Sequence, residues 1–413
     1  MMTSTVSGPL SDGFDFVDPD MMQRGLPLEE FAELRRTAPL WWNAQPLGAG
    51  GFSDGGFWVV SRHEHIKAIS RDNENWSTND NGVVISFFEG MDPAVLDSTK
   101  ALLINHDPPE HTRLRKIVSK LFTPRGVAEL DEKLRIAAAA IVAESREKGS
   151  GDFIEDIAAK LPVLAIADLI GVPAQDRQAF FGWANSCINF TDPDAQTEDP
   201  ATASANLLGY AHAMAEDRRK NPKDDIVTML VQADLDGDWM TEGEFGFFVM
   251  LLAVAGNETT RNAITHGMNA FMDNPDQWEL YRRERPKTAA DEIVRWATPV
   301  NCFQRTARND VELGGATIRT GQRVGLFYGS GNYDDAVFHS PRRFDITRSP
   351  NPHLGFGGNG THYCIGANLA RMEITLMFDA IADTIPGIRK RSEPTRVRSP
   401  WLNGLKTFEV DYR

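Results

Sequence analysis

Residues 351–374 read NPHLGFGGNGTHYCIGANLARMEI, and they place a single cysteine, Cys364, between a glycine-rich loop and the start of a helix. Glycine adopts backbone conformations that other residues avoid, so this loop allows backbone amides to approach the sulfur closely. Amides and a helix N-terminus both favour a thiolate over a thiol. A thiolate is a good ligand for a soft metal, so Cys364 is a candidate metal ligand.

Two other interpretations of Cys364 compete with a haem ligand. A lone cysteine is most often a buried and inert thiol, but the glycine-rich loop argues against that state here. Zinc could be held by His353, His362 and Cys364, although His362 and Cys364 are closer in sequence than zinc ligands usually are. Haem iron is a further possibility, and a cysteine thiolate bound to it promotes cleavage of the O–O bond. Cys187 and Cys302 lack such a context and are predicted to be core residues.

Composition narrows the class of protein. The 413 residues carry a net charge of −15, which argues against general nucleic-acid binding. Three cysteines without a CxxC pair indicate a reducing compartment. The N-terminus lacks the pattern of a signal peptide, and the longest apolar run, residues 247–256, is too short to span a bilayer. We therefore expect a cytoplasmic protein without a membrane span.

Hydrophobic periodicity predicts a mainly α fold with a small β portion, in a single domain over residues 1–413. Irregular short strands are expected at 56–61, 306–313 and 316–327. Helices are expected at 126–147, 203–220, 241–272, 287–297 and from about 365 to 384. The longest of these begins with a Thr241/Glu244 capping box and stops before Pro275. It would be roughly 45–50 Å long and must cross the whole molecule.

The middle of the long helix reads AVAGNETTRN, residues 253–262. Ala255 and Gly256 are small enough for the helix to lie against a flat cofactor. The Thr259 hydroxyl can bind the carbonyl of Ala255 and loosen that turn, and Glu258 adds an ionisable group beside it. These residues could bind dioxygen and deliver protons, although an ordinary helix with a polar interruption has the same appearance.

Together the two segments resemble the cytochrome P450 superfamily, through Gly358, Gly360, His362, Cys364 and Gly366 at the family's spacing. The resemblance implies the P450 fold, with haem b between the long helix and the Cys-loop helix. It makes Cys364 the axial ligand, gives Glu258 and Thr259 the proton-delivery role, and makes O2 the co-substrate. The chain departs from the family at Gly357, where a phenylalanine is usual; Phe356 stands one position earlier.

The resemblance also implies roles for several charged residues. Glu292 and Arg295 match a buried brace whose third member would be Arg343. Cationic partners for the haem propionates would be His111, Arg115, Arg305 and His362; arginine suits carboxylates because its planar fork is always charged. Each of these residues could otherwise be an ordinary solvated charge.

Apolar residues from several segments predict a cavity without a charged anchor, although each residue alone is more often part of the core. The residues expected to contact substrate are Val83, Phe87, Val254, Val300, Phe303 and Trp401. From about Asp224 to Tyr412 the chain looks like actinobacterial steroid C26/C27-monooxygenases, in segments such as TAADEIVRWATPV and RSPWLNGLK. That likeness implies hydroxylation of the terminal side-chain methyl of cholesterol or cholest-4-en-3-one.

Electrons must come from outside, because the chain has no flavin or iron–sulfur motif. The expected partners are a ferredoxin and its NAD(P)H-dependent reductase. A basic patch of Arg113, Lys116, Lys120 and Arg371 could dock the ferredoxin, or could be a solvated face. A P450 for a branched fatty acid or a terpenoid is the alternative enzyme. A haem-thiolate sensor without turnover is disfavoured, because binding alone needs no proton relay.

Overall fold

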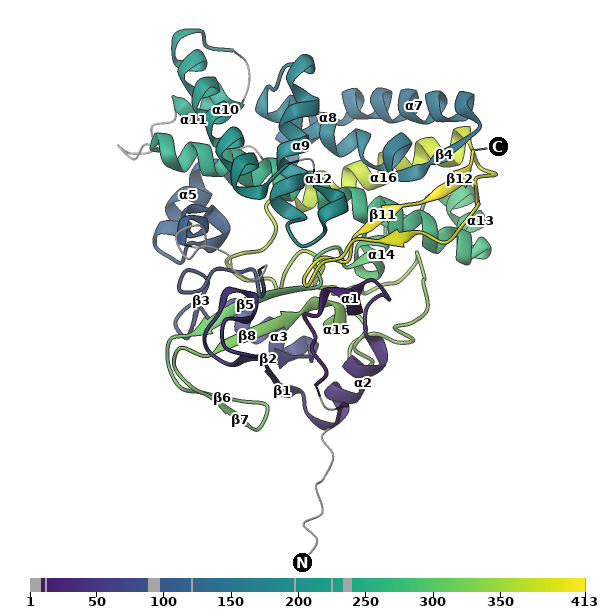
Figure 1. The fold of residues 1–413 in the computed structure, drawn as a ribbon. Coiled ribbons are helices and arrows are strands. Elements are labelled where there is room, and N and C mark those ends of the chain that lie inside the picture. The colour runs from purple at the N-terminus through teal and green to yellow at the C-terminus, as the bar shows by residue number, and fades with distance from the viewer. Residues whose placement is uncertain are drawn as a thin grey trace, which may run out of the picture.

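The computed structural model describes residues 9–11, 13–87, 97–119, 122–196, 198–223, 226–232 and 240–412. Most helices gather in one part of the molecule, and the largest sheet lies in another part, beside the N-terminal helices (Figure 1). The prediction of a mainly α fold with a small β portion is confirmed.

The helices run as follows: α1 (Pro19–Met22), α2 (Leu28–Thr37), α3 (His63–Arg71), α5 (Glu110–Ser119), α6 (Pro124–Ala128), α7 (Asp131–Lys148), α8 (Lys160–Ile170), α9 (Arg177–Ile188), α10 (Pro200–Lys220), α11 (Ile226–Val231), α12 (Glu242–Asp273), α13 (Pro275–Glu284), α14 (Ala289–Ala297), α15 (Tyr328–Gly331) and α16 (Ala367–Thr384). The strands are β1 (Leu40–Ala44), β2 (Gly56–Val60), β3 (Trp76–Ser77), β4 (Ser150–Asp152), β5 (Cys302–Ala307), β6 (Val311–Leu313), β7 (Ala316–Ile318), β8 (Arg323–Phe327), β9 (Arg389–Lys390), β10 (Thr395–Arg396), β11 (Leu405–Thr407) and β12 (Glu409–Asp411).

Helix α12 is the predicted long helix, and it runs through the middle of the helical part (Figure 1). The predicted capping box is present: the Glu244 amide donates to the Thr241 hydroxyl at 3.2 Å, and the Thr241 amide donates to the Glu244 carboxylate at 2.7 Å. Both bonds satisfy amides that the helix itself leaves unpaired. Pro275 then starts α13, so the predicted stop is also confirmed.

One predicted helix was wrong as a single element. Residues 126–147 are divided between α6 and α7, with the break at Glu129 and Leu130. Helix α7 begins with Asp131 and Glu132, and acidic side chains in the first turn favour the positive N-terminal end of a helix. The apolar period continues across the break, which is why the pattern alone suggested one helix.

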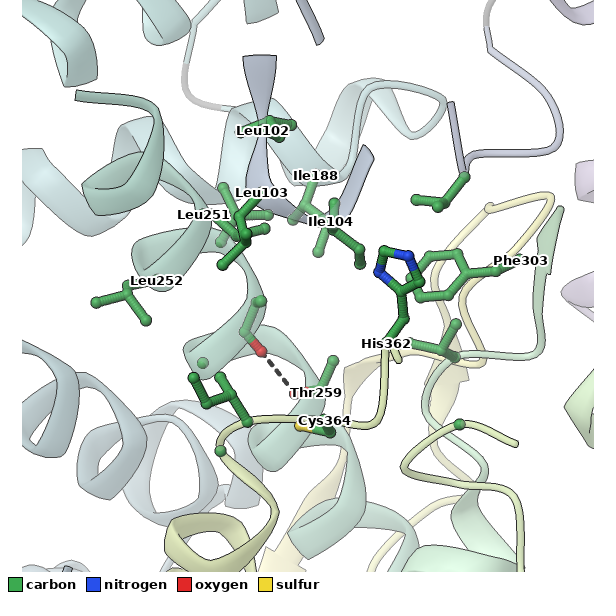
Figure 2. Close-up of a pocket in the computed structure, with 18 of the residues that line it drawn as sticks. Leu102, Leu103, Ile104, Ile188, Leu251, Leu252, Thr259, Phe303, His362 and Cys364 are labelled. Carbon is green, nitrogen blue, oxygen red and sulfur yellow. Dashed lines mark hydrogen bonds between the residues drawn. The ribbon is translucent and has the colours of Figure 1, made fainter. Parts of the chain in front are cut away.

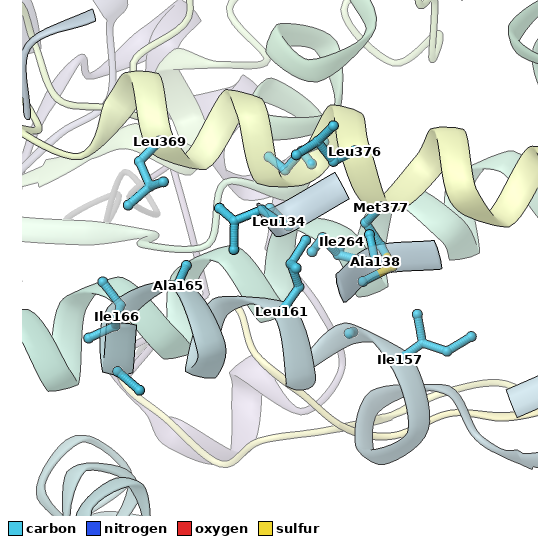
Figure 3. Close-up of a cluster of buried hydrophobic side chains, with 14 of the residues drawn as sticks. Leu134, Ala138, Ile157, Leu161, Ala165, Ile166, Ile264, Leu369, Leu376 and Met377 are labelled. Atoms are coloured by element: carbon cyan, nitrogen blue, oxygen red, sulfur yellow. The ribbon is translucent and has the colours of Figure 1, made fainter. Parts of the chain in front are cut away.

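The main core lies between α7, α8, α12 and α16 (Figure 3). Leu134 of α7, Leu161 of α8, Ile264 of α12 and Leu376 of α16 are each at most 3% exposed. Burial of such side chains contributes about 1.5–3 kcal/mol each. This packing fixes α16, and α16 begins only three residues after Cys364.

The largest sheet has the strand order β1-β2-β8-β5-β3. In the antiparallel pair β5 and β8, Phe303 faces Leu326 and Arg305 faces Val324. Side chains two positions apart point to the same side of a strand. Phe303 and Arg305 therefore both reach the large cavity between the sheet and the helices.

The predicted charged brace forms with a different third member. Arg295 donates to both oxygens of Glu292 at 2.7 and 2.8 Å, and both residues are fully buried. The third cation is Arg348, which donates to Glu292 at 3.1 Å. Arg343 was the wrong choice, because its side chain is exposed and only its carbonyl meets Arg295. A turn, in which the Arg348 amide donates to Asp345, brings the later arginine back toward Glu292.

Candidate active site

One cavity of about 560 Å³ brings together Cys364, the middle of α12 and the apolar residues expected to contact substrate (Figure 2). Of the fifteen residues predicted for the site, the cavity is lined by all except Glu258: Val83, Phe87, His111, Arg115, Val254, Ala255, Gly256, Thr259, Val300, Phe303, Arg305, His362, Cys364 and Trp401. They come from segments hundreds of positions apart in the chain, and the fold alone joins them.

The loop before Cys364 packs tightly against the end of α3. A methyl group at Gly360 would lie 1.5 Å from the carbonyl oxygen of Ser70, and one at Gly358 would lie 2.2 Å from the Ser70 hydroxyl. Gly357 has a φ of +94°, a conformation that side chains disfavour. The departure at Gly357 thus has a backbone reason, because a phenylalanine there would be strained.

Cys364 is reached from the cavity, although it lies deep within the protein. Its own amide donates to the Phe356 carbonyl at 2.9 Å, which fixes the residue in the loop. Burial raises the pKa of the Cys364 thiol, while the Gly366 amide and the charges of Arg115 and Arg371 lower it. The sequence predicted that the loop favours a thiolate. Burial favours the neutral thiol, however, and it has the larger effect on the pKa of Cys364. A coordinated metal ion deprotonates a thiol outright.

Four nitrogen-bearing side chains line the cavity close to Cys364. Arg305 is 5% exposed and donates to the Gln304 carbonyl at 2.6 Å, and Arg115 donates to the Tyr363 carbonyl. Among the described residues, neither guanidinium has a carboxylate within ion-pair distance. Buried charges are normally paired, so the buried Arg305 and the half-buried Arg115 fit a ligand that carries two carboxylates.

The two histidines add neutral donors to this group. The rings of His111 and His362 lie 4.2 Å apart between their centres. Burial, with Arg115 and His106 nearby, lowers the pKa of His111 to about 4, and burial also lowers the pKa of His362 well below its usual value. The Nδ1 atom of His111 is buried without a partner among the described residues. Unpaired buried polar atoms and unpaired arginines are the features that haem propionates would satisfy.

On α12 the Thr259 hydroxyl donates to the Ala255 carbonyl at 2.7 Å, as expected (Figure 2). The turn is not loosened, however, because the helix is continuous from Glu242 to Asp273. Ala255 is open to the cavity, which agrees with a small residue facing a flat cofactor. Gly256 has a second reason to be small, since a methyl group there would lie 2.4 Å from Ile166 of α8.

Glu258 is buried but turned away from the cavity. Its Oε1 atom accepts from Arg261 and, at 3.1 Å, from the Asn262 side chain. Its Oε2 atom has no partner among the described residues. Helical periodicity explains this orientation, because Glu258 and Thr259 are neighbours that point about 100° apart around α12.

The far end of the cavity is apolar, and much of it was missed from sequence. Phe303 stacks on Trp401 with ring centres 5.7 Å apart, and Phe87 stacks on Phe190 at 5.5 Å. Phe88, which follows Phe87 in the same apolar segment, lies outside the described residues. Additional lining side chains come from Leu102, Leu103, Ile104, Ile188, Leu251 and Leu252 (Figure 2). Only Leu251 and Leu252 stood in a segment that the apolar pattern had indicated.

The other two cysteines differ from each other. Cys302 is fully buried, as predicted, and burial raises the pKa of its thiol well above the usual value. Cys187 is only partly buried: it packs against the main core, as predicted, but it also lines the cavity and contacts the Ser204 hydroxyl at 3.3 Å. Its position near the C-terminal end of α9 gave no local signal of this.

The zinc alternative has no geometric support. His353 binds Asp291 at 3.0 Å, whereas His362 faces His111. In the described ranges no three histidine, cysteine or acidic side chains are grouped as metal ligands. Within the same ranges, none of the helices is both long and apolar enough to cross a bilayer.

Comparisons with known proteins agree with this geometry. Residues 287–382 match the family model described as cytochrome P450. The chain is 55% identical to the steroid C26-monooxygenase of Rhodococcus jostii (strain RHA1), over 100% of this chain and 87% of the relative. It is 39% identical to the methyl-branched lipid omega-hydroxylase of Mycobacterium tuberculosis (strain H37Rv), over 92% of this chain and 90% of that protein.

A solved structure shows the same fold. Mycobacterium marinum cytochrome P450 CYP268A2, in complex with pseudoionone, superposes with a TM-score of 0.88 and is 37% identical. The match covers 95% of this chain and 97% of that one. The close relatives and the shared fold lead to one conclusion: this chain belongs to the cytochrome P450 family, whose monooxygenases use haem b and O2.

Proposed function

We propose that this P450 hydroxylates the terminal side-chain methyl, C26 or C27, of a sterol such as cholesterol or cholest-4-en-3-one. The observation that carries the proposal is the cavity, which joins Cys364 and Thr259 at one end to a long apolar lining. A steroid C26-monooxygenase is 55% identical to this chain, which supports the same choice of substrate.

In this proposal the sulfur of Cys364 would bind the haem iron, and His111, Arg115, Arg305 and His362 would hold the two propionates. When bound through a thiolate, haem supplies the activation of dioxygen and the cleavage of its O–O bond. Ala255 and Gly256 leave room for the flat group beside α12. The protein's contribution is to hold the group in a dry cavity and to aim the substrate at it.

Proton delivery is assigned to Thr259 and Glu258. The Thr259 hydroxyl lines the cavity and can present a proton at its oxygen, while the Ala255 carbonyl orients it. Glu258 is held by Arg261 outside the cavity, so it delivers a proton only after its side chain turns toward Thr259. The ion pair with Arg261 thus holds the Glu258 carboxylate away from Thr259 between proton transfers.

The apolar lining accounts for the proposed position of attack. A terminal methyl has stronger C–H bonds than the neighbouring tertiary carbon, so geometry must override reactivity. Val83, Val254, Val300, Phe303 and Trp401 line the cavity with Thr259 and Cys364. A cavity that admits only the end of the chain would present the methyl by positioning.

We propose a ferredoxin with its NAD(P)H-dependent reductase as the electron source. The predicted docking patch is partly neutralised: Arg113 pairs with Glu110 and Glu244, and Arg371 pairs with Asp291. Lys116 is exposed, and Lys120 lies outside the described residues. A single domain over residues 1–413 and a cytoplasmic location remain predictions.

A methyl-branched lipid is the second candidate substrate. An omega-hydroxylase of such lipids is 39% identical to this chain, and a branched chain end resembles the end of a sterol side chain. A flexible lipid and a rigid sterol differ mainly in the width that they need at the far end of the cavity.

An optical titration of the purified ferric protein distinguishes the two candidates. Cholest-4-en-3-one should give a saturable low-spin to high-spin shift at low concentration, and a methyl-branched fatty acid should give a weaker one. A shift with the fatty acid alone would replace the sterol by the lipid. Product analysis then tests the position of attack, because hydroxylation mainly at C25 would contradict the positioning of the methyl.

A further inference from the structure

A cationic side chain lies beside the cysteine loop on the side of α14. We propose that Arg371, oriented by Asp291, is a positioning residue whose charge acts on Cys364 through Phe356 and sets the reduction potential of the haem iron. The inference rests on the proposed ligation by Cys364. It gives Arg371 a role in tuning the iron that differs from the docking role expected from sequence.

Arg371 is held on three sides. Its Nε atom donates to Asp291 at 2.7 Å, and its Nη2 atom lies 3.5 Å from the Tyr363 hydroxyl. Its guanidinium carbon is 4.5 Å from the centre of the Phe356 ring. A planar guanidinium suits simultaneous stacking and hydrogen bonding better than an ammonium does. Arg371 is 32% exposed, so this cation is oriented by the protein and is not a freely moving surface charge.

Both aromatic residues that contact Arg371, Phe356 and Tyr363, are directly connected to Cys364. The Phe356 carbonyl accepts the Cys364 amide at 2.9 Å, and Tyr363 precedes Cys364 in the chain. The one-residue shift that puts Gly357 in place of the usual phenylalanine leaves the Phe356 ring under Arg371.

Asp291 fixes the cation from α14. The same Oδ1 atom receives Arg371 and the His353 ring, at 2.7 and 3.0 Å. The His353 Nδ1 atom accepts the Gly355 amide at 3.2 Å. One carboxylate thus connects α14, α16 and the beginning of the cysteine loop, and it also offsets part of the charge of Arg371.

The expected signs follow from electrostatics. Reduction adds a negative charge to the iron and its ligands, so a nearby cation stabilises the reduced state and raises the potential. A nearby carboxylate has the opposite effect. Both residues are about one-third exposed, so water screens each contribution.

The test measures the ferric/ferrous potential of substrate-free, haem-loaded protein. Arg371→Gln should lower the potential, Arg371→Lys should stay closer to wild type, and Asp291→Asn, which keeps an acceptor oxygen, should raise it. Arg285→Gln is a matched control: Arg285 is 30% exposed, pairs with Asp379 of α16 and lies 5.2 Å from the Tyr281 ring. Its loss should leave the potential near wild type.

Each outcome has one meaning. Equal potentials for Arg371→Gln and wild type, equal shifts for Arg371→Gln and Arg371→Lys, or a lowered potential in Asp291→Asn would overturn the inference. If Arg371→Gln fails to load haem, the rise expected for Asp291→Asn decides the matter. The ferrous–CO spectrum of the wild type tests the ligation separately: without a thiolate-type Soret band the proposed ligation fails, whatever the variants show.

Discussion

The cysteine loop (residues 351–366) and the far end of the cavity (around residues 102–104 and 187–190) line one cavity but are built differently. The loop is contiguous, and it packs so closely on α3 that Gly358 and Gly360 have no room for side chains. The far end is assembled from apolar side chains of separate segments. The chemistry thus depends on close backbone contacts, and the choice of substrate depends on the shape of an apolar surface.

The largest difference in activity between the two regions should appear when the cysteine of each region is substituted. We expect Cys364→Ala to lose the thiolate-type ferrous–CO band and all monooxygenation, because no other side chain replaces the sulfur. Cys187→Ser removes the thiol at the far end and should keep both. Normal turnover by Cys364→Ala would remove the basis of the site.

A second pair of variants compares backbone contact with open space. Gly360→Ala should destabilise the fold by about 3 kcal/mol, because the added methyl overlaps the Ser70 carbonyl. Gly209→Ala on α10 meets nothing within 4 Å, and it should stabilise its helix by about 0.5–1 kcal/mol. Urea unfolding followed by circular dichroism measures both. Equal urea midpoints for the two variants would show that the loop shifts to make room for the added methyl group more easily than its contacts imply.

A third variant tests the polar part of the cavity. Thr259→Ala should continue to consume NADH, while product per NADH falls by about 100-fold, the lower end for a positioned proton-transfer group. Thr259→Ser retains the hydroxyl and should recover most of the coupling. Unchanged coupling in Thr259→Ala would remove the proposed role. Sterol affinity should change little in either variant.

The smallest effect is expected at the apolar surface. Leu251→Ala enlarges the cavity and should weaken sterol binding by about 10-fold, since a few buried methylene groups contribute on the order of 1–2 kcal/mol. Spin-state titration measures this change. Leu47→Ala, at a side chain that is 77% exposed, is the control. If Leu251→Ala lowered the product formed per NADH as much as Thr259→Ala does, the apolar surface and the proton-delivery site would not act separately.

Prediction from sequence succeeded where the signal was local. The capping box of α12, the start of α16 after the glycine loop and the hydrogen bond from Thr259 to Ala255 each involve residues a few positions apart. Prediction failed where the contacts of a side chain depend on residues that are distant in the sequence. Arg348 replaced Arg343 in the brace, and Cys187 lines the cavity as well as packing against the core.

The sequence by itself determined that one cysteine lies between a glycine-rich loop and the start of a helix, and that a long helix crosses the molecule. These properties follow from backbone constraints and composition, which contiguous residues carry. Only the tertiary structure decided that Glu258 turns to Arg261 and that Arg371 stacks on Phe356. The partner of a charged side chain depends on which groups lie within a few ångströms through space, and no spacing along the chain records that.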